Sequence, residues 1–235
     1  AASWGRQMMA PELAGRLRLI AFDLRGHGAS DKPTAREAYH DNQRWAEDVA
    51  SVIRATGAER PILVAWSYGG RVVGDYLAAF GDVRIGGLNM VAATTTGERF
   101  GLGRNIGLIG GMLADDAAAA SAGTEKFLRA CFEKPPSDTE IADMVAFNNQ
   151  TPVAVRKLLG GRPARYDDVF RRVRVPVLIS HGELDQISAV AMSQHTRTLV
   201  PSAQLSMYLG VGHAPFYEDA GRFNRELRAL ARQVR

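Results

Sequence analysis

Ser67 stands where a side chain could act as a nucleophile, directly after an apolar run and among small residues. Ile62 to Trp66 is a short apolar run typical of a buried strand, and Gly69 and Gly70 follow the serine. Small side chains two positions to either side of Ser67 are expected, because larger ones would collide with backbone at a sharp strand-to-helix turn. A serine presented on such a turn can attack a substrate when a base lies within hydrogen-bond reach.

The base and its partner have candidates near the C-terminus. A serine hydroxyl is a weak nucleophile near neutral pH, so it needs a base, and the base needs a group that fixes its tautomer. His213 comes shortly after the apolar run Gln204 to Tyr208, and the carboxylates Glu183 and Asp185 follow the run Val175 to Ser180. The carboxyl ends of parallel strands meet at one edge of a sheet, so we expect these groups to gather there.

Three stretches together resemble the α/β-hydrolase superfamily in order and spacing. The stretch Ala65-Trp66-Ser67-Tyr68-Gly69 resembles its nucleophile elbow, with alanine at the first small position instead of glycine. His181-Gly182-Glu183-Leu184-Asp185-Gln186-Ile187 resembles its acid loop, and Gly210-Val211-Gly212-His213-Ala214-Pro215-Phe216 resembles its histidine loop. The resemblance implies Ser67 as nucleophile, His213 as general base and Asp185 as the acid that orients the histidine. Glu183, two residues from Asp185, is the competing acid.

The same resemblance implies an activity. We expect a serine hydrolase of the carboxylesterase type, which cleaves a small-to-medium apolar carboxylic ester through an acyl-enzyme intermediate. Perhydrolase or haloperoxidase-like activity and hydrolysis of a carbon-carbon bond use the same triad and stay open. An alternative from another class is a relative that keeps the fold as a non-catalytic ligand pocket.

The resemblance also implies how the site is completed. The backbone NH of Tyr68 is expected in the oxyanion hole, and Trp66 and Tyr68, as neighbours of the nucleophile, are expected to contact substrate or core. In the family a second oxyanion donor comes from a loop after an earlier strand, and the residues Ala2-Ser3-Trp4 and Met8-Met9 resemble the segment that comes after that loop. We therefore expect a chain that lacks the N-terminal strands of the family, or one whose two exposed strands pair directly in a smaller sheet.

The elements that must position these residues follow an α/β pattern, with a mostly parallel sheet flanked by helices. A helix is expected around Trp45 to Ile53, ended by Gly57, and a final helix is expected after Asp219. The expected strands are Leu17 to Phe22, Pro61 to Trp66, Gly87 to Ala92, Val175 to Ser180 and Gln204 to Tyr208.

One stretch breaks this alternation. Residues 97–170 begin with a glycine-rich segment, continue with an alanine run and a proline pair, and end in helical spacing. We expect residues 1–96 and 171–235 to form the α/β core and residues 97–170 to form a helical cap insertion. The apolar side chains of this insertion either line an acyl pocket or pack the cap on the core.

Composition limits the partners. The net charge of +4 comes from dispersed arginines, so no nucleic-acid partner is expected. No apolar run is long enough to span a membrane, and the single cysteine excludes an internal disulfide, so a cytoplasmic protein is expected. The glycines between Gly101 and Gly107 lack dinucleotide-binding spacing, and no metal-ligand spacing occurs, so neither cofactor nor metal is expected. The natural substrate and the oligomeric state stay open.

Overall fold

A four-stranded parallel sheet forms the centre of the computed structural model, which describes residues 2–234. The strands lie in the order β1-β2-β3-β4, with Ile62 opposite Gly87, Leu88 opposite Val177 and Leu178 opposite Gln204. All four strands therefore end at the same edge. Their bounds are β1 Ile62–Trp66, β2 Gly87–Val91, β3 Val177–Gly182 and β4 Gln204–Tyr208.

Helices connect and cover the strands. The α-helices are α1 Gly5–Met8, α2 Pro11–Ala14, α3 Glu37–His40, α4 Asn42–Thr56, α5 Gly69–Phe80, α6 Ala117–Ala130, α7 Asp138–Asn149, α8 Val153–Leu159, α9 Asp167–Phe170, α10 Val190–Leu199, α11 Pro215–Glu218 and α12 Ala220–Ala231. Short 3₁₀ helices are η1 Ala2–Trp4, η2 Arg99–Gly101 and η3 Ile106–Leu113. Two helix ends predicted from the sequence are confirmed, because α4 stops at Gly57 with φ of 60° and Asp219 caps α12.

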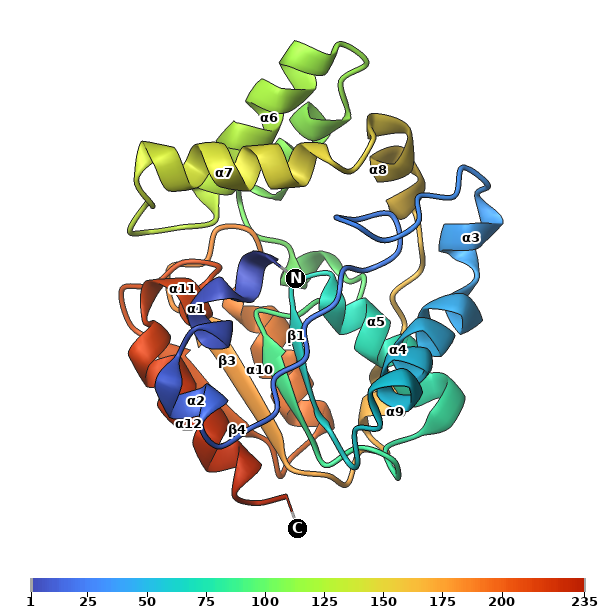
Figure 1. The fold of residues 1–235 in the computed structure, drawn as a ribbon, viewed down its shortest axis with the longest axis vertical. Coiled ribbons are helices and arrows are strands. Elements are labelled where there is room, and N and C mark those ends of the chain that lie inside the picture. The colour runs from blue at the N-terminus through green and yellow to red at the C-terminus, as the bar shows by residue number, and fades with distance from the viewer. Residues whose placement is uncertain (1, 235) are drawn as a thin grey trace.

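The helices form a layer on each side of the sheet (Figure 1). On one side α4, α5 and α9 pack with α10 in a core that includes Trp45, Tyr76 and Phe170. On the other side α2, α11 and α12 enclose a second core around Phe216 and Phe223. Burial of both sheet faces explains why the strand sequences are apolar almost throughout.

The prediction of a strand at Leu17 to Phe22 is wrong. The structure leaves residues 17–22 outside the sheet, as an extended segment that joins α2 to the turn at residue 25. Its apolar side chains still find a core, because Leu17 and Leu19 pack on the same cluster as Ile62. A strand needs a hydrogen-bonded neighbour as well as the right residues, and β1, the edge strand, is paired only with β2. Of the two alternatives expected from the sequence, direct pairing of the two exposed strands is therefore also wrong.

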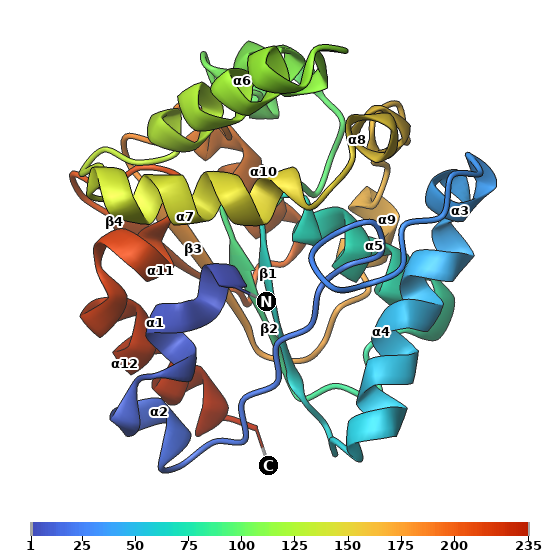
Figure 2. The same ribbon diagram turned by 45° about the horizontal axis from the view of Figure 1, so that its top comes forward.

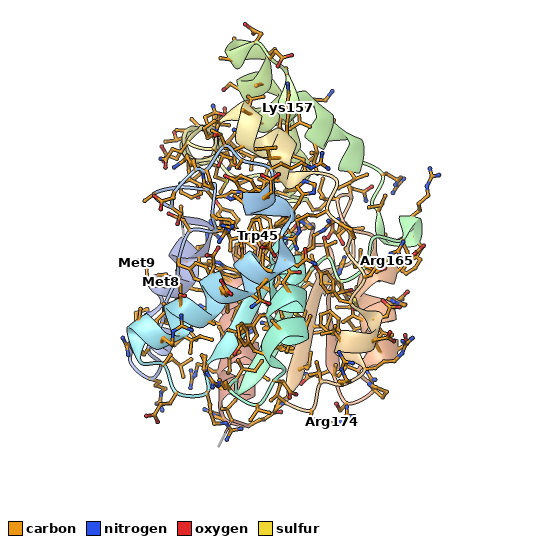
Figure 3. All side chains as sticks on the ribbon, turned by 90° about the vertical axis from the view of Figure 1, so that its right-hand side faces the viewer. Met8, Met9, Trp45, Lys157, Arg165 and Arg174 are labelled. Atoms are coloured by element: carbon orange, nitrogen blue, oxygen red, sulfur yellow. The ribbon has the colours of Figure 1, made fainter. Side chains whose placement is uncertain are left out.

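The segment after β2 rises above the carboxyl edge of the sheet. Helices α6, α7 and α8 lie across the top of the molecule in Figures 1 and 2. Figure 3 shows the same arrangement from the side: Lys157 of α8 lies near the top of the molecule, and Arg174, shortly before β3, lies near the bottom. The two ends of this segment meet at an antiparallel bridge between Thr96 and Arg165, where Gly97 N donates to Ala164 O at 2.8 Å. Within residues 2–234, no helix is long and apolar enough to cross a membrane.

Candidate active site

Ser67 occupies the turn between β1 and α5. Its φ of 52° lies in the left-handed region, which residues other than glycine adopt rarely and at a cost. The turn is held from the neighbouring strand, because Ser67 N donates to Val91 O at 3.0 Å and Thr94 N donates to Ser67 O at 2.9 Å. The strained backbone presents the serine at the carboxyl edge of the sheet.

The tightest packing at this turn differs from the prediction. A Cβ atom at Gly69 would lie 3.5 Å from the Cβ of Ala65, which is ordinary contact. A Cβ atom at Gly70 would lie 2.7 Å from Thr94 O and 2.8 Å from Thr94 N, so no side chain fits there. The residue that must be glycine for steric reasons is therefore Gly70, where α5 passes over the backbone that continues from β2.

The structure brings Asp185 and His213 together. Asp185 is buried, its Oδ2 accepts a hydrogen bond from His213 Nδ1 at 2.7 Å, and its Oδ1 accepts from the backbone N–H groups of Ile187 and Ser188. Glu183, the competing acid, accepts instead from Gly210 N at 3.3 Å. The two loops meet because Gly182 has no side chain: a Cβ atom there would lie 1.9 Å from Gly212 O.

The backbone of His213 is fixed on both sides of the residue. His213 N donates to Cys131 O at 2.8 Å, and His213 O accepts from Trp66 Nε1 at 2.8 Å. The Glu218 carboxylate accepts from Gly212 N and also from the backbone of residues 133 and 134, between α6 and α7. The histidine loop is therefore tied both to the residue before Ser67 and to the segment above the sheet.

His213 has one ring nitrogen without a partner. Nδ1 must donate in the neutral ring, because the Asp185 carboxylate can only accept, and this leaves Nε2 as the acceptor. Nε2 is buried and has no hydrogen-bond partner among the described residues, Ser67 included. The Trp66 ring lies 5.3 Å from the His213 ring, centroid to centroid. The structure thus pairs Asp185 with His213 and places Ser67 at the end of β1, without a direct bond from Ser67 to His213.

Comparison with known proteins decides the family. Residues 1–226 match the model of the alpha/beta hydrolase family. The chain belongs to the alpha/beta hydrolase family. The fold class predicted from the sequence is thereby confirmed.

Known members of the family resemble this alpha/beta hydrolase along most of its length. The crystal structure of a putative aryl esterase from Burkholderia cenocepacia is 33% identical with a TM-score of 0.93, and covers 98% of this chain and 85% of its own. An esterase from Rhodococcus sp. ECU1013 is 35% identical with a TM-score of 0.90, and covers 99% of this chain and 86% of its own. A bifunctional esterase/perhydrolase from Acinetobacter calcoaceticus is 26% identical, and the match covers 97% of this chain and 86% of that protein.

The electrostatics of this alpha/beta hydrolase keep the Asp185 carboxylate ionised. Burial acts to raise the pKa of Asp185, but attraction to the imidazolium form of His213 and hydrogen bonds from His181 and His213 outweigh burial and hold that pKa well below its usual range. Cys131, beside the histidine loop, is also buried. Burial, together with the charges of Asp185 and Glu218, raises the pKa of the Cys131 thiol, so the thiol stays protonated.

The two neighbours of Ser67 have partners inside the protein. The Trp66 ring packs on Phe216 with centroids 5.0 Å apart, in addition to its bond to the histidine loop. The Tyr68 ring lies 5.7 Å from the Trp45 ring, and burial raises the pKa of its hydroxyl. Both residues are only partly buried, so contact with substrate stays a prediction. No side chain caps the N-terminus of α5, which begins directly after Tyr68.

Sequence reasoning missed a buried ionic cluster beneath the turn. Arg162 forms an ion pair with Asp75 of α5, and both side chains are fully buried. Tyr166 donates to the other oxygen of Asp75 at 2.7 Å, and Arg71 donates to Arg162 O at 2.6 Å. These contacts tie the chain returning from α8 to the helix that begins after Ser67. The available signal was a pair of charged residues, Arg71 and Asp75, one helical turn apart in an otherwise apolar helix.

Proposed function

We propose that this alpha/beta hydrolase is a serine esterase that cleaves a small-to-medium apolar carboxylic ester through an acyl-enzyme intermediate. Ser67 is the nucleophile, His213 the general base and Asp185 the acid that orients the base. The observation that carries the proposal is the His213 ring, which bonds to a buried carboxylate through Nδ1 and keeps a buried acceptor, Nε2, without a partner. A buried acceptor without a hydrogen bond costs free energy, and this cost is removed when a proton donor binds there.

The chemistry runs in two halves. When Ser67 Oγ attacks the ester carbonyl, its proton passes to His213 Nε2, and Asp185 stabilises the imidazolium that forms. The developing oxyanion lies against the backbone NH of Tyr68 and the uncapped start of α5, whose dipole favours negative charge. His213 then gives its proton to the leaving alcohol. Water activated by His213 attacks the acyl group and releases the acid, which restores Ser67.

The segment of residues 97–170 serves as the cap in this proposal. It stands over the edge of the sheet where Ser67 and His213 lie, and its backbone holds the histidine loop through Cys131 O. Phe100, Leu102 and Ile109 keep exposed apolar surface within it, which suits an apolar acyl or alkoxy group. The esterase relatives support hydrolysis of an ester as the reaction type.

The test is covalent labelling of the nucleophile. A fluorophosphonate should label wild-type protein at Ser67 and should not label Ser67→Ala. Ser51→Ala, which changes an exposed serine of α4, is the matched control and should be labelled like wild type. A panel of p-nitrophenyl esters of rising acyl length then defines the substrate class. A folded wild-type protein that takes no label and hydrolyses none of the esters contradicts the proposal.

A second candidate reaction is formation of a peracid at the same site. It is favoured by the relative described as a bifunctional esterase/perhydrolase. Hydrogen peroxide would replace water in attack on the acyl-enzyme, so the acyl group leaves as a peracid and Ser67 recovers its proton. Peracid that accumulates with acetate and hydrogen peroxide, and is absent in Ser67→Ala, would establish this activity beside ester hydrolysis.

A further inference from the structure

His181 is a second imidazole on the carboxylate that orients His213. It lies at the carboxyl end of β3 and is fully buried. Its Nε2 is 3.2 Å from Asp185 Oδ2, the same oxygen that His213 contacts, and 3.0 Å from Ser188 O. Its Nδ1 is 2.6 Å from Ser193 Oγ of α10.

These partners determine the proton positions on His181. A carboxylate and a carbonyl oxygen can only accept, so Nε2 must carry a hydrogen, which it donates to Ser188 O at 3.0 Å and brings within 3.2 Å of Asp185 Oδ2. In the neutral ring Nδ1 then accepts the hydroxyl proton of Ser193. This tautomer satisfies both ring nitrogens without a positive charge.

Four N–H groups consequently lie within reach of the Asp185 carboxylate. Two backbone N–H groups, of Ile187 and Ser188, fill Oδ1, and the imidazoles of His181 and His213 share Oδ2. A carboxylate held at both oxygens cannot rotate about its Cβ–Cγ bond without losing partners. The donor from His181 therefore fixes the direction of the bond from Oδ2 to His213, and it also takes up part of the negative charge on that oxygen.

We propose that His181 is a positioning residue, which holds Asp185 in the orientation that His213 needs and moderates the attraction of the carboxylate for a proton on His213. This inference rests on the proposed function for its kinetic consequences but not for its geometry. The ionisable groups around the contact are Asp185 on the loop after β3, His213 before α11, Cys131 after α6 and, beyond Cys131, Glu218 on α11. Neither Cys131 nor Glu218 donates a hydrogen bond to Asp185 Oδ2 in the way that the two imidazoles do.

Two amide substitutions separate positioning from packing. The amide nitrogen of His181→Gln reaches about as far as Nε2 and can still donate to Asp185, whereas that of His181→Asn reaches only as far as Nδ1 and can meet Ser193. Both replace a buried ring by a polar amide of smaller volume. A purely structural role predicts similar losses in both variants, and positioning predicts that only His181→Asn loses function. His195→Leu, which removes the half-buried imidazole paired with Asp167, is the control.

The kinetic readout is the pH profile of kcat/KM for a p-nitrophenyl ester. In His181→Asn we expect kcat to fall about tenfold with little change in KM. With one donor fewer, Oδ2 attracts the His213 proton more strongly, so the acid limb should move to higher pH by about half a unit. His181→Gln and His195→Leu should keep the limb of the wild type. Equal profiles in the Asn and Gln variants would overturn the proposal.

A second readout needs no turnover. The low-field proton resonance of His213 Nδ1–H, observed in the folded protein, should shift in His181→Asn and stay close to wild type in His181→Gln. A shift confined to the Asn variant supports the positioning role, whether or not the protein hydrolyses an ester. If that shift is seen but no ester is hydrolysed, only the proposed function fails. A resonance that is the same in both variants and in the wild type overturns the positioning role even in an active esterase.

Discussion

The indole of Trp66 donates a hydrogen bond to the backbone oxygen of His213 at 2.8 Å, across 147 positions of the sequence. Trp66 immediately precedes Ser67, so the residue before the proposed nucleophile directly holds the proposed base. The Trp66 ring also contacts the His213 ring and rests on Phe216. One side chain therefore links the end of β1 directly to the histidine loop.

Loss of the hydrogen bond from Trp66 to His213 O should lower the reaction rate of Ser67 while the protein stays folded. Trp66→Phe keeps an aromatic ring on Phe216 but leaves His213 O without its donor, which costs about 1–2 kcal/mol. We expect the rate of fluorophosphonate labelling to fall by about tenfold with a single cooperative thermal transition retained. Trp4→Phe, which alters another ring that packs on Phe216, is the control and should label within about twofold of wild type. Unchanged labelling of Trp66→Phe would contradict this role.

Two adjacent glycines should respond differently to one methyl group. In Gly70→Ala the new Cβ meets Thr94 backbone atoms at 2.7 and 2.8 Å, so the turn must shift and unfolding free energy should fall by about 2 kcal/mol or more. Gly69→Ala makes only a 3.5 Å contact with Ala65 and should be as stable as wild type. Urea unfolding measures both variants. Similar midpoints for the two would show that Gly70 is not sterically required.

Removal of one partner of the buried Arg162–Asp75 ion pair should destabilise the protein, whereas replacement of both partners by apolar residues should cost much less free energy. Arg162→Met leaves the Asp75 carboxylate buried without its guanidinium, which should cost about 3–5 kcal/mol. The double substitution Asp75→Leu with Arg162→Met removes both charges and should recover much of that loss. Two guanidinium nitrogens of Arg162, Nε and Nη1, already lack partners among the described residues, which lowers the value of the pair. A double variant less stable than Arg162→Met in chemical denaturation would contradict this account.

The ionised state of Asp185 should make stability depend on pH. Its folded-state pKa lies below the value of about 3.9 in an unfolded chain, so its contribution is present above that value and is lost as pH falls further. The stability difference between wild type and Asp185→Asn should therefore shrink as pH is lowered from about 5 to about 2. A difference that stays constant in urea titrations between about pH 5 and about pH 2 would contradict this account. Activity of Asp185→Asn should drop on the order of 10³- to 10⁴-fold.

Local residue patterns were enough to predict much of the framework. The sequence predicted strands at four of the places where they occur, because strands buried on both faces must be apolar, and it predicted the ends of α4 and α12 from Gly57 and Asp219. It placed Ser67 directly after the first of these strands and the segments carrying Asp185 and His213 after the last two. Each of these features depends on neighbours a few residues apart.

The tertiary structure decided everything that depends on contacts between distant residues. Leu17 to Phe22 has the composition of a strand, but a strand also needs a hydrogen-bonded neighbour, and the composition of a segment does not show whether it has one. Glycine is required at position 70 because the backbone of Thr94 packs against it. The role proposed for His181 depends on the position of β3, which places its imidazole 3.2 Å from Asp185 Oδ2. Hydrogen bonds and steric contacts act over a few ångströms, so partners far apart in the chain are fixed only once the chain has folded.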